Sequence, residues 1–224
     1  MPPPLPHQRR KTERPDELLE AALALFVERG FAATRMDDVA QRAGVSKGTV
    51  YLYWSSKEDL LRTVIQRFLG GHLDRGEELV GRHEGTTVDL LRHRYVEWWS
   101  AVLDSPASGV FKLMLAEARN FPDVAQYYQR EVVERGRGMV LRMLEDGVAR
   151  GEFRPVDLEQ AAFSLLMPMV MLCVHRHALD LCWPAEQSQA MVSGHVELLL
   201  HGLLAGDDAP SKITGPAART ANGA

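Results

Sequence analysis

The stretch MDDVAQRAGVSKGTVYLY, residues 36–53, decides the fold of this chain. Its spacing predicts two short helices joined by a tight turn at residues 44–46, which is a helix-turn-helix. Ala40 and Ala43 are small enough for the helices to cross closely, and Gly44 can adopt the positive φ that such a turn needs. Three apolar side chains should fill the junction between the two helices: Val39, Val45 and Val50.

The second of these helices presents side chains suited to nucleic acid. Lys and Tyr suit phosphates, and Thr offers a hydroxyl and a methyl group to base edges in the major groove. A glycine near the helix start lets the helix approach the DNA backbone. The residues concerned are Lys47, Gly48, Thr49, Tyr51 and Tyr53. A merely solvated surface is the alternative for Lys47, Thr49 and Tyr51, and packing beneath the helix-turn-helix is the alternative for Tyr53.

Charge is distributed unevenly around this motif. The whole chain carries a net charge of −4, which by itself argues against nucleic acid. Residues 39–57, however, contain three basic side chains and no acid, and residues 1–14 hold four basic side chains against one acid. Residues 63–224 are acidic overall, so the two ends of the molecule differ in character. The basic start, with Arg9, Arg10 and Lys11, is either a minor-groove arm or a solubilising tail.

Apolar residues recur at helical spacing along the 224 residues, whereas strand-like alternation never persists, so we predict an all-α fold. The length suits two modest domains or one elongated one. Ser46 with Thr49 begins one helix and Asp157 with Gln160 caps another, and prolines and glycines punctuate the rest. The longer expected helices run from Pro15 to Gly30, from Lys57 onward, and over about 86–103, 107–119, 122–150, 157–177 (with Pro168 inside) and 185–204.

The stretches TRMDDVA (residues 34–40) and AGVSKGTVYLYWSSKEDL (residues 43–60) resemble the DNA-binding domain of the tetracycline-repressor (TetR) family. The preceding helix, with its Leu25-Phe26 and Gly30-Phe31 pairs, is also similar to that family's first helix. The resemblance covers about residues 10–62. Trp54 stands where the family often has Phe, and this aromatic exchange should preserve packing.

The resemblance implies an all-α homodimer with a three-helix, N-terminal DNA-reading unit and a C-terminal helical bundle that binds ligand and dimerises. The helix over residues 47–53 would enter the major groove, and Lys57 would meet a phosphate. Thr34 and Arg35, which open the matching stretch, join the expected DNA-binding set. The expected parts are a mobile basic arm (1–12), the helix-turn-helix domain (13–60), the ligand-binding and dimerisation domain (61–206) and a flexible tail (207–224).

Aromatic and Met side chains in the C-terminal part suggest an effector pocket. Spaces between the helices of a bundle are usual pocket sites, and Met is common on surfaces that accept varied apolar ligands. We expect a mostly apolar pocket that draws on Tyr95, Trp98, Met114, Phe163 and Met167. Ordinary core packing is the alternative for each of them.

The uncharged run from Ala161 to Val174 is apolar almost all round. It has fourteen residues, fewer than the roughly 18–20 of a membrane span, so we expect no membrane association. One helix face would satisfy the core of the subunit, and the surplus suggests an identical subunit as partner. We expect the last helix to contribute to the same four-helix interface through Val192, Val196, Leu199 and Leu203.

The sequence contains no nucleophile elbow, Walker loop, dinucleotide fingerprint or zinc-ligand spacing. We therefore expect neither an enzyme nor a cofactor or metal site, and we interpret Cys173 and Cys182 as reduced cytoplasmic thiols. The function predicted is a ligand-responsive repressor, released from a palindromic operator in double-stranded DNA by a small, mostly apolar effector. The alternatives are an α-helical enzyme or carrier, and a constitutive DNA-architectural protein. The sequence leaves the operator, the effector and the choice between repression and activation open.

Overall fold

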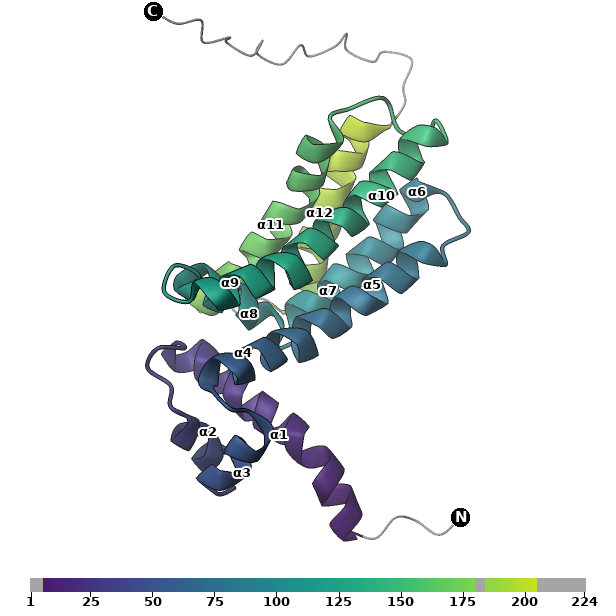
Figure 1. Ribbon diagram of the computed structural model, residues 1–224. Helices are drawn as coiled ribbons and strands as arrows, with labels where there is room; N and C mark the ends of the chain where they lie inside the picture. Colours follow the sequence, from purple (N-terminus) through teal and green to yellow (C-terminus); the bar gives the residue numbers. More distant parts are fainter. Residues whose placement is uncertain (1–5, 180–183, 205–224) are drawn as a thin grey trace, which may run out of the picture.

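The computed structural model describes residues 6–179 and 184–204, with the backbone alone at residues 6–14 and 185. The described part is built from helices, and its one β-bridge joins Phe153 to Leu204. This confirms the all-α prediction. The helices form two parts, a head of α1 to α4 and a larger bundle of α5 to α12 (Figure 1). The predicted tail, the first residues of the predicted arm and Cys182 lie outside the described residues.

The head forms around the first helix, which packs against α2 and α4. Its predicted apolar face is buried, with Leu18, Leu25 and Phe26 at most 1% exposed. The prediction that this helix begins near Pro15 is wrong. The helix begins at Pro6 and continues through Pro15. The fixed φ of proline fits a helix, although its missing N–H costs one backbone hydrogen bond. The head helices are α1 (Pro6–Arg29), α2 (Met36–Arg42), α3 (Lys47–Tyr53) and α4 (Lys57–Ile65).

The helix-turn-helix has the geometry that its sequence predicts. Gly44 has φ +66°, in the region that favours glycine, and places α3 across α2. Val39 and Val50 are buried at the crossing, and Val45 packs partly buried against them. The side chain of Ser46 caps α3 by accepting a hydrogen bond from the backbone N–H of Thr49.

The last head helix continues into the bundle without a break, so the domain boundary expected near residue 60 falls inside α4 (Figure 1). In the described part of the chain, three π-helical segments, η1 to η3, join α-helices end to end, and such segments often occur at functional sites. The remaining elements are η1 (Gln66–Gly70), α5 (Gly71–Gly81), α6 (Thr87–Asp89), η2 (Leu90–Tyr95), α7 (Val96–Asp104), α8 (Ser108–Glu117), α9 (Pro122–Tyr128), η3 (Gln129–Glu134), α10 (Arg135–Ala149), α11 (Leu158–Ala178) and α12 (Ala185–Leu203).

The bundle packs around α11, which contacts α8 and α10, while α12 lies against α7. Asp157 caps α11 by accepting from the backbone N–H of Gln160, as its sequence predicts. Among the described residues, α11 alone is long and apolar enough to cross a membrane by length and composition. Only 28% of its most apolar window is buried within the chain, so much of its apolar surface faces outward.

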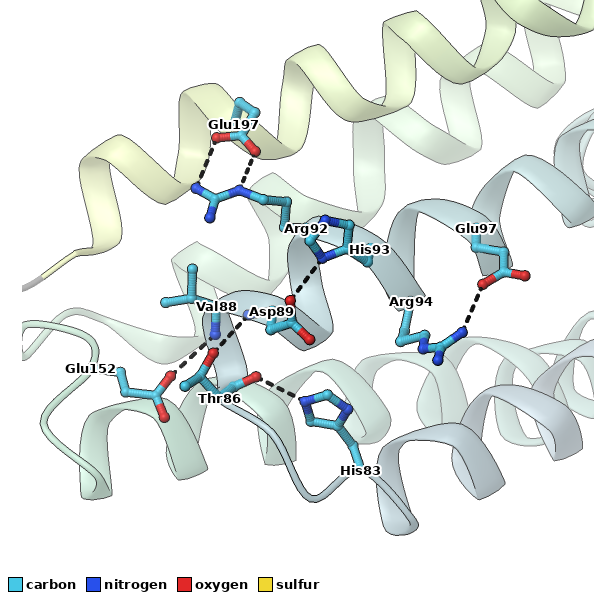
Figure 2. Close-up of polar contacts among 10 residues, drawn as sticks. All are labelled: His83, Thr86, Val88, Asp89, Arg92, His93, Arg94, Glu97, Glu152 and Glu197. Carbon is cyan, nitrogen blue, oxygen red and sulfur yellow. Dashed lines mark hydrogen bonds and ion pairs between the residues drawn. The ribbon is translucent and has the colours of Figure 1, made fainter.

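Polar contacts close the end of the bundle that lies far from the head (Figure 2). Arg92 of η2 forms two hydrogen bonds, 2.5 and 3.1 Å long, with the carboxylate of Glu197 on α12. Glu152, which follows α10, accepts a hydrogen bond from the backbone N–H of Val88 at 3.1 Å. These contacts join η2 to α12 and the start of α6 to the end of α10.

Candidate DNA-binding head and effector cavity

The reading helix α3 lies at the end of the head away from the bundle (Figure 1). Its outer surface carries three large exposed side chains: Tyr51 (45% exposed), Leu52 (83%) and Tyr53 (41%). Lys47 and Gly48 are exposed as well, and Thr49 is half-buried with its hydroxyl 2.9 Å from Ser46 Oγ. All of the predicted contact residues of α3 are therefore at least partly accessible to solvent.

Two cationic side chains of the helix-turn-helix form ion pairs with carboxylates of the head. Lys47 Nζ lies 2.8 Å from Asp37 Oδ1, and this contact raises the pKa of Lys47. Arg42 forms hydrogen bonds of 2.6 and 2.8 Å with Glu28. The basic surplus that residues 39–57 show in sequence is thus partly neutralised in space by Asp37 and Glu28, which lie earlier in the chain.

Lys57 is partly buried, and its ammonium is held by the head itself. Its ammonium donates to the backbone oxygens of Phe31, Ala32 and Thr34, at 2.7, 3.2 and 2.8 Å. An ammonium has three N–H donors, so all of them are used. Burial lowers the pKa of Lys57. These contacts favour an internal role over the expected phosphate contact, because α4 begins beneath the loop that follows α1.

Thr34 is also an internal residue, only 1% exposed. Its hydroxyl donates to the backbone oxygen of Gly30 at 2.8 Å, next to the end of α1, where helical carbonyls lack partners. We therefore correct its expected DNA contact. Arg35 differs: it is exposed, directly precedes α2, and its backbone N–H donates to Asp38 Oδ2 at 2.8 Å. Arg35 remains accessible to DNA.

The bundle contains a predominantly apolar cavity of about 240 Å³. Two of the five predicted pocket residues, Trp98 and Met167, line it. Trp98 and Trp99 stack edge-to-face with ring centroids 5.0 Å apart. The other lining residues are Leu69, His72, Leu73, Trp99, Val102, Phe111, Tyr128, Val132, Val133, Gly136, Arg137, Leu166 and Val170.

Three predicted pocket residues lie elsewhere. Tyr95 is buried in the core and its hydroxyl donates to the backbone oxygen of Leu165 at 3.1 Å. Met114 is buried outside the cavity lining, and Phe163 is 58% exposed. Helical spacing identifies an apolar face but not the void that packing leaves beside it. Phe111 and Tyr128 were missed for the same reason.

Few polar groups line the cavity, and its one imidazole and its one guanidinium already have partners. His72 Nδ1 lies 3.0 Å from Arg75 Nη2, and its Nε2 lies 3.1 Å from Ser105 Oγ. Burial, followed by the nearby Arg75 charge, lowers the pKa of His72 to about 4, so this imidazole is neutral at pH 7. Arg137 forms an ion pair with Glu159, with one contact at 2.9 Å. The cavity thus favours apolar groups.

One helix joins the cavity to the head. Phe111 of α8 lines the cavity, and on the same helix Lys112 Nζ donates to the backbone oxygen of Val27 at 3.1 Å. Gly109 lies so close to Val27 that a Cβ there would stand 2.6 Å from its Cγ2. At the end of α8, Glu117 Oε1 accepts from the backbone N–H of Ala32 at 3.4 Å. A displacement of α8 would therefore also displace α1.

The outward surface of the bundle contains exposed apolar side chains on α11 and α12. Phe163, Met167 and Met171 recur every four residues along α11, and Met191 and Leu198 lie exposed on α12. The prediction that four residues of α12 belong to this surface is wrong. Val192, Val196 and Leu203 are buried within the subunit, and Leu199 is partly buried against the same core.

Comparison with known proteins matches both parts of the chain. Residues 18–64 match the family model of bacterial regulatory proteins of the tetR family, and residues 92–207 match the C-terminal domain of AefR-like transcriptional repressors. The chain is 33% identical to the HTH-type transcriptional regulator YfiR of Bacillus subtilis over 66% of its own length and 71% of that protein. It is 31% identical to the HTH-type transcriptional repressor KstR2 of Mycolicibacterium smegmatis, over 71% and 75% of the two chains.

The fold is similar to that of a solved regulator as well. The transcriptional regulator FadR of Bacillus subtilis, in complex with stearoyl-CoA, superimposes with a TM-score of 0.71 at 22% identity, over 84% of this chain and 98% of that one. The chain therefore belongs to the tetR family of bacterial regulatory proteins and is a ligand-responsive, DNA-binding transcriptional regulator.

Proposed function

We propose that the protein is a homodimeric repressor in the cytoplasm that leaves a palindromic operator when an apolar effector enters the bundle. One observation carries the proposal. The helices that line an apolar cavity also connect to the DNA-reading head. The helix α4 runs through η1 into α5, and α8 contacts both the head and the bundle. This arrangement favours a regulator over an enzyme or carrier and over a constitutive DNA-architectural protein.

Dimerisation would use the exposed apolar side chains of α11 and α12. Burial of such a surface against a second copy is favourable by about 25 cal/mol per Å² of apolar area. A two-fold axis through this surface would present two α3 helices, and such heads read major grooves about 34–36 Å apart. The operator would accordingly be a palindrome. Met167 both lines the cavity and is exposed on α11, so an effector would touch a helix of the interface.

The effector would be an apolar molecule or carry an apolar chain. Apolar cavities stay dry and bind apolar ligands, even at about 150 Å³. His72 is neutral and Arg137 is paired, so a charged group gains little inside the cavity. The stearoyl chain in the FadR complex is apolar, and so are the ketosteroids for which KstR2 of Mycobacterium tuberculosis, a ketosteroid transcriptional regulator of similar fold, is named.

Coupling would follow two routes to the head. Leu69 of η1 and His72 and Leu73 of α5 line the cavity, and their helix continues backward into α4. Phe111 lines it from α8, whose contacts with Val27 fix α1. An effector that favours a different arrangement of these helices shifts the equilibrium between two head spacings. The shift is no larger than the difference in the effector's affinity for the two states.

Selection of random duplex DNA by the purified protein at about 0.15 M salt tests the proposal. Enrichment of one palindrome is the expected result. Apolar compounds and compounds with an apolar chain, stearoyl-CoA among them, would then be screened by tryptophan fluorescence and by release of the selected duplex. Enrichment of no sequence by the folded protein would contradict the repressor function.

A further inference from the structure

Leu52 has the largest exposed fraction, 83%, of the large exposed apolar side chains in the described part of the chain. It lies on α3 between two exposed tyrosines and does not contribute to the core. A single exposed leucine is common on protein surfaces. This one, however, stands on the helix that would enter the major groove, where a side chain that contributes nothing to folding can contribute to recognition.

Two other polar side chains of α3, those of Lys47 and Thr49, already have partners within the head. Lys47 pairs with Asp37 at 2.8 Å, and the Thr49 hydroxyl lies 2.9 Å from Ser46 Oγ. Gly48 shares the helix face of Leu52, four residues earlier, and has no side chain to shield it. On the face that it shares with Gly48, the side chain of Leu52 is therefore free to meet a base pair.

The chemistry of the groove restricts what a leucine can recognise. The base edges in the major groove present hydrogen-bond donors and acceptors, and their one apolar group is the 5-methyl of thymine. A leucine placed against donors and acceptors would leave them without water or partner, which is unfavourable. Contact with a thymine methyl buries apolar surface on both sides.

We propose that Leu52 is a specificity-determining residue that reads one thymine 5-methyl group in each operator half-site. The proposal rests on the proposed function, since it needs site-specific binding of DNA by α3. It also differs from recognition by hydrogen bonds, because the group that is read has no polar atom.

Replacement of thymine by deoxyuridine in the selected duplex tests this reading, because it removes the methyl group and leaves every hydrogen-bonding atom in place. At one thymine per half-site, the replacement should raise the Kd of the wild-type protein about threefold to fivefold for each half-site. Leu52→Ala should bind the thymine and uracil duplexes equally. Leu52→Met, which keeps the apolar volume, should retain the difference.

Leu115→Ala is the matched control, because Leu115 is a 70% exposed leucine on α8 of the bundle. It should discriminate between the duplexes as the wild type does. Urea unfolding should be unchanged by Leu52→Ala, given its exposure. The proposal is overturned if the wild type binds thymine and uracil duplexes equally at every position, or if Leu52→Ala still discriminates between them. In either case, a selected palindrome leaves the proposed function intact. Enrichment of no sequence overturns both.

Discussion

Lys57 Nζ lies 2.7 Å from the backbone oxygen of Phe31 and 4.4 Å from the centroid of its ring. The same Phe31 ring stacks edge-to-face on Phe121, which follows α8, with centroids 4.6 Å apart. The loop after α1 is therefore held by α4 on one side and by the bundle on the other. We therefore expect Lys57 to stabilise the junction of head and bundle, and to affect DNA binding through geometry rather than through a phosphate.

Lys57→Met should lower the free energy of unfolding by about 1–3 kcal/mol, because three carbonyls lose a charged donor. The slope of log Kd against log salt should stay unchanged, because Lys57 neutralises no phosphate. Lys47→Met provides the comparison: it should leave stability nearly unchanged and reduce the slope by about 0.9 for each phosphate that is no longer neutralised. Urea denaturation and salt titrations measure both quantities. A flatter slope for Lys57→Met would restore its role as a phosphate-binding residue.

Asp37→Asn should strengthen DNA binding. Lys47 must leave its pair with Asp37 to meet a phosphate, and an exposed pair is worth about 0.2–1 kcal/mol. The amide should therefore lower the Kd for all sequences by up to about fivefold per head, most clearly at low salt. Glu197→Gln, at the far end of the bundle (Figure 2), is the control and should leave the Kd unchanged. Weaker binding by Asp37→Asn would show that the carboxylate positions α2 or α3.

Gly109→Ala should destabilise the contact between α8 and α1. The added Cβ would stand 2.6 Å from Val27 Cγ2, so the helices must separate, at a cost of about 1–3 kcal/mol. Val27→Ala in the same chain should recover part of this loss, since it removes the clashing methyl groups. Gly138→Ala on α10, whose Cβ would meet only Arg142 Nη1 at 3.5 Å, is the control. Thermal unfolding distinguishes these cases, and additive effects of the two changes would argue against the close contact.

Stability should decrease as pH falls from about 6.5 to 4, in part because of His72. Its folded pKa of about 4 lies below the value of about 6.5 for an unfolded histidine, so the unfolded chain binds the proton first. His72→Gln should therefore lose less stability than the wild type between about pH 7 and pH 5. His177, whose pKa is also lowered by burial, contributes alike in both proteins. Equal losses in urea denaturation would mean that His72 titrates normally.

Phe163→Glu should convert the dimer to monomers, because it places a charge in the apolar surface of α11. Sedimentation at micromolar concentration measures the change. Leu115→Glu, which alters an exposed leucine on α8, should leave the dimer intact. A dimer that survives Phe163→Glu would place the interface elsewhere.

The helices are predicted well from short stretches of sequence, because helix caps and turns depend on only a few neighbouring residues. Ser46 and Asp157 cap the helices that they were expected to cap, and Gly44 has the positive φ expected of it. The first helix is the exception, since proline is compatible with a helix that starts earlier.

Which groups a side chain contacts depends on tertiary packing, so these contacts could not be predicted from the sequence in the same way. The residue type of Lys57 suits a phosphate as well as it suits three carbonyls, and only the fold brings those carbonyls within 3.2 Å. Tyr95 and Trp99 both have aromatic side chains on one helical run, yet only Trp99 lines the cavity. On α12, the strongest apolar periodicity marks the inner face, so Val192 and Val196 were assigned to the wrong surface.

The most direct test of ligand-controlled DNA binding is the Kd for the selected duplex, measured while the most effective quencher of tryptophan fluorescence in the apolar panel is titrated. The wild-type protein and Val132→Phe, which fills the cavity from η3, would be compared after unfolding curves show that both are folded. We predict that the compound raises the Kd of the wild type about 5- to 150-fold and leaves the Kd of Val132→Phe unchanged. A compound that binds the wild type without changing its Kd, or that acts equally on Val132→Phe, would contradict control of the head through this cavity.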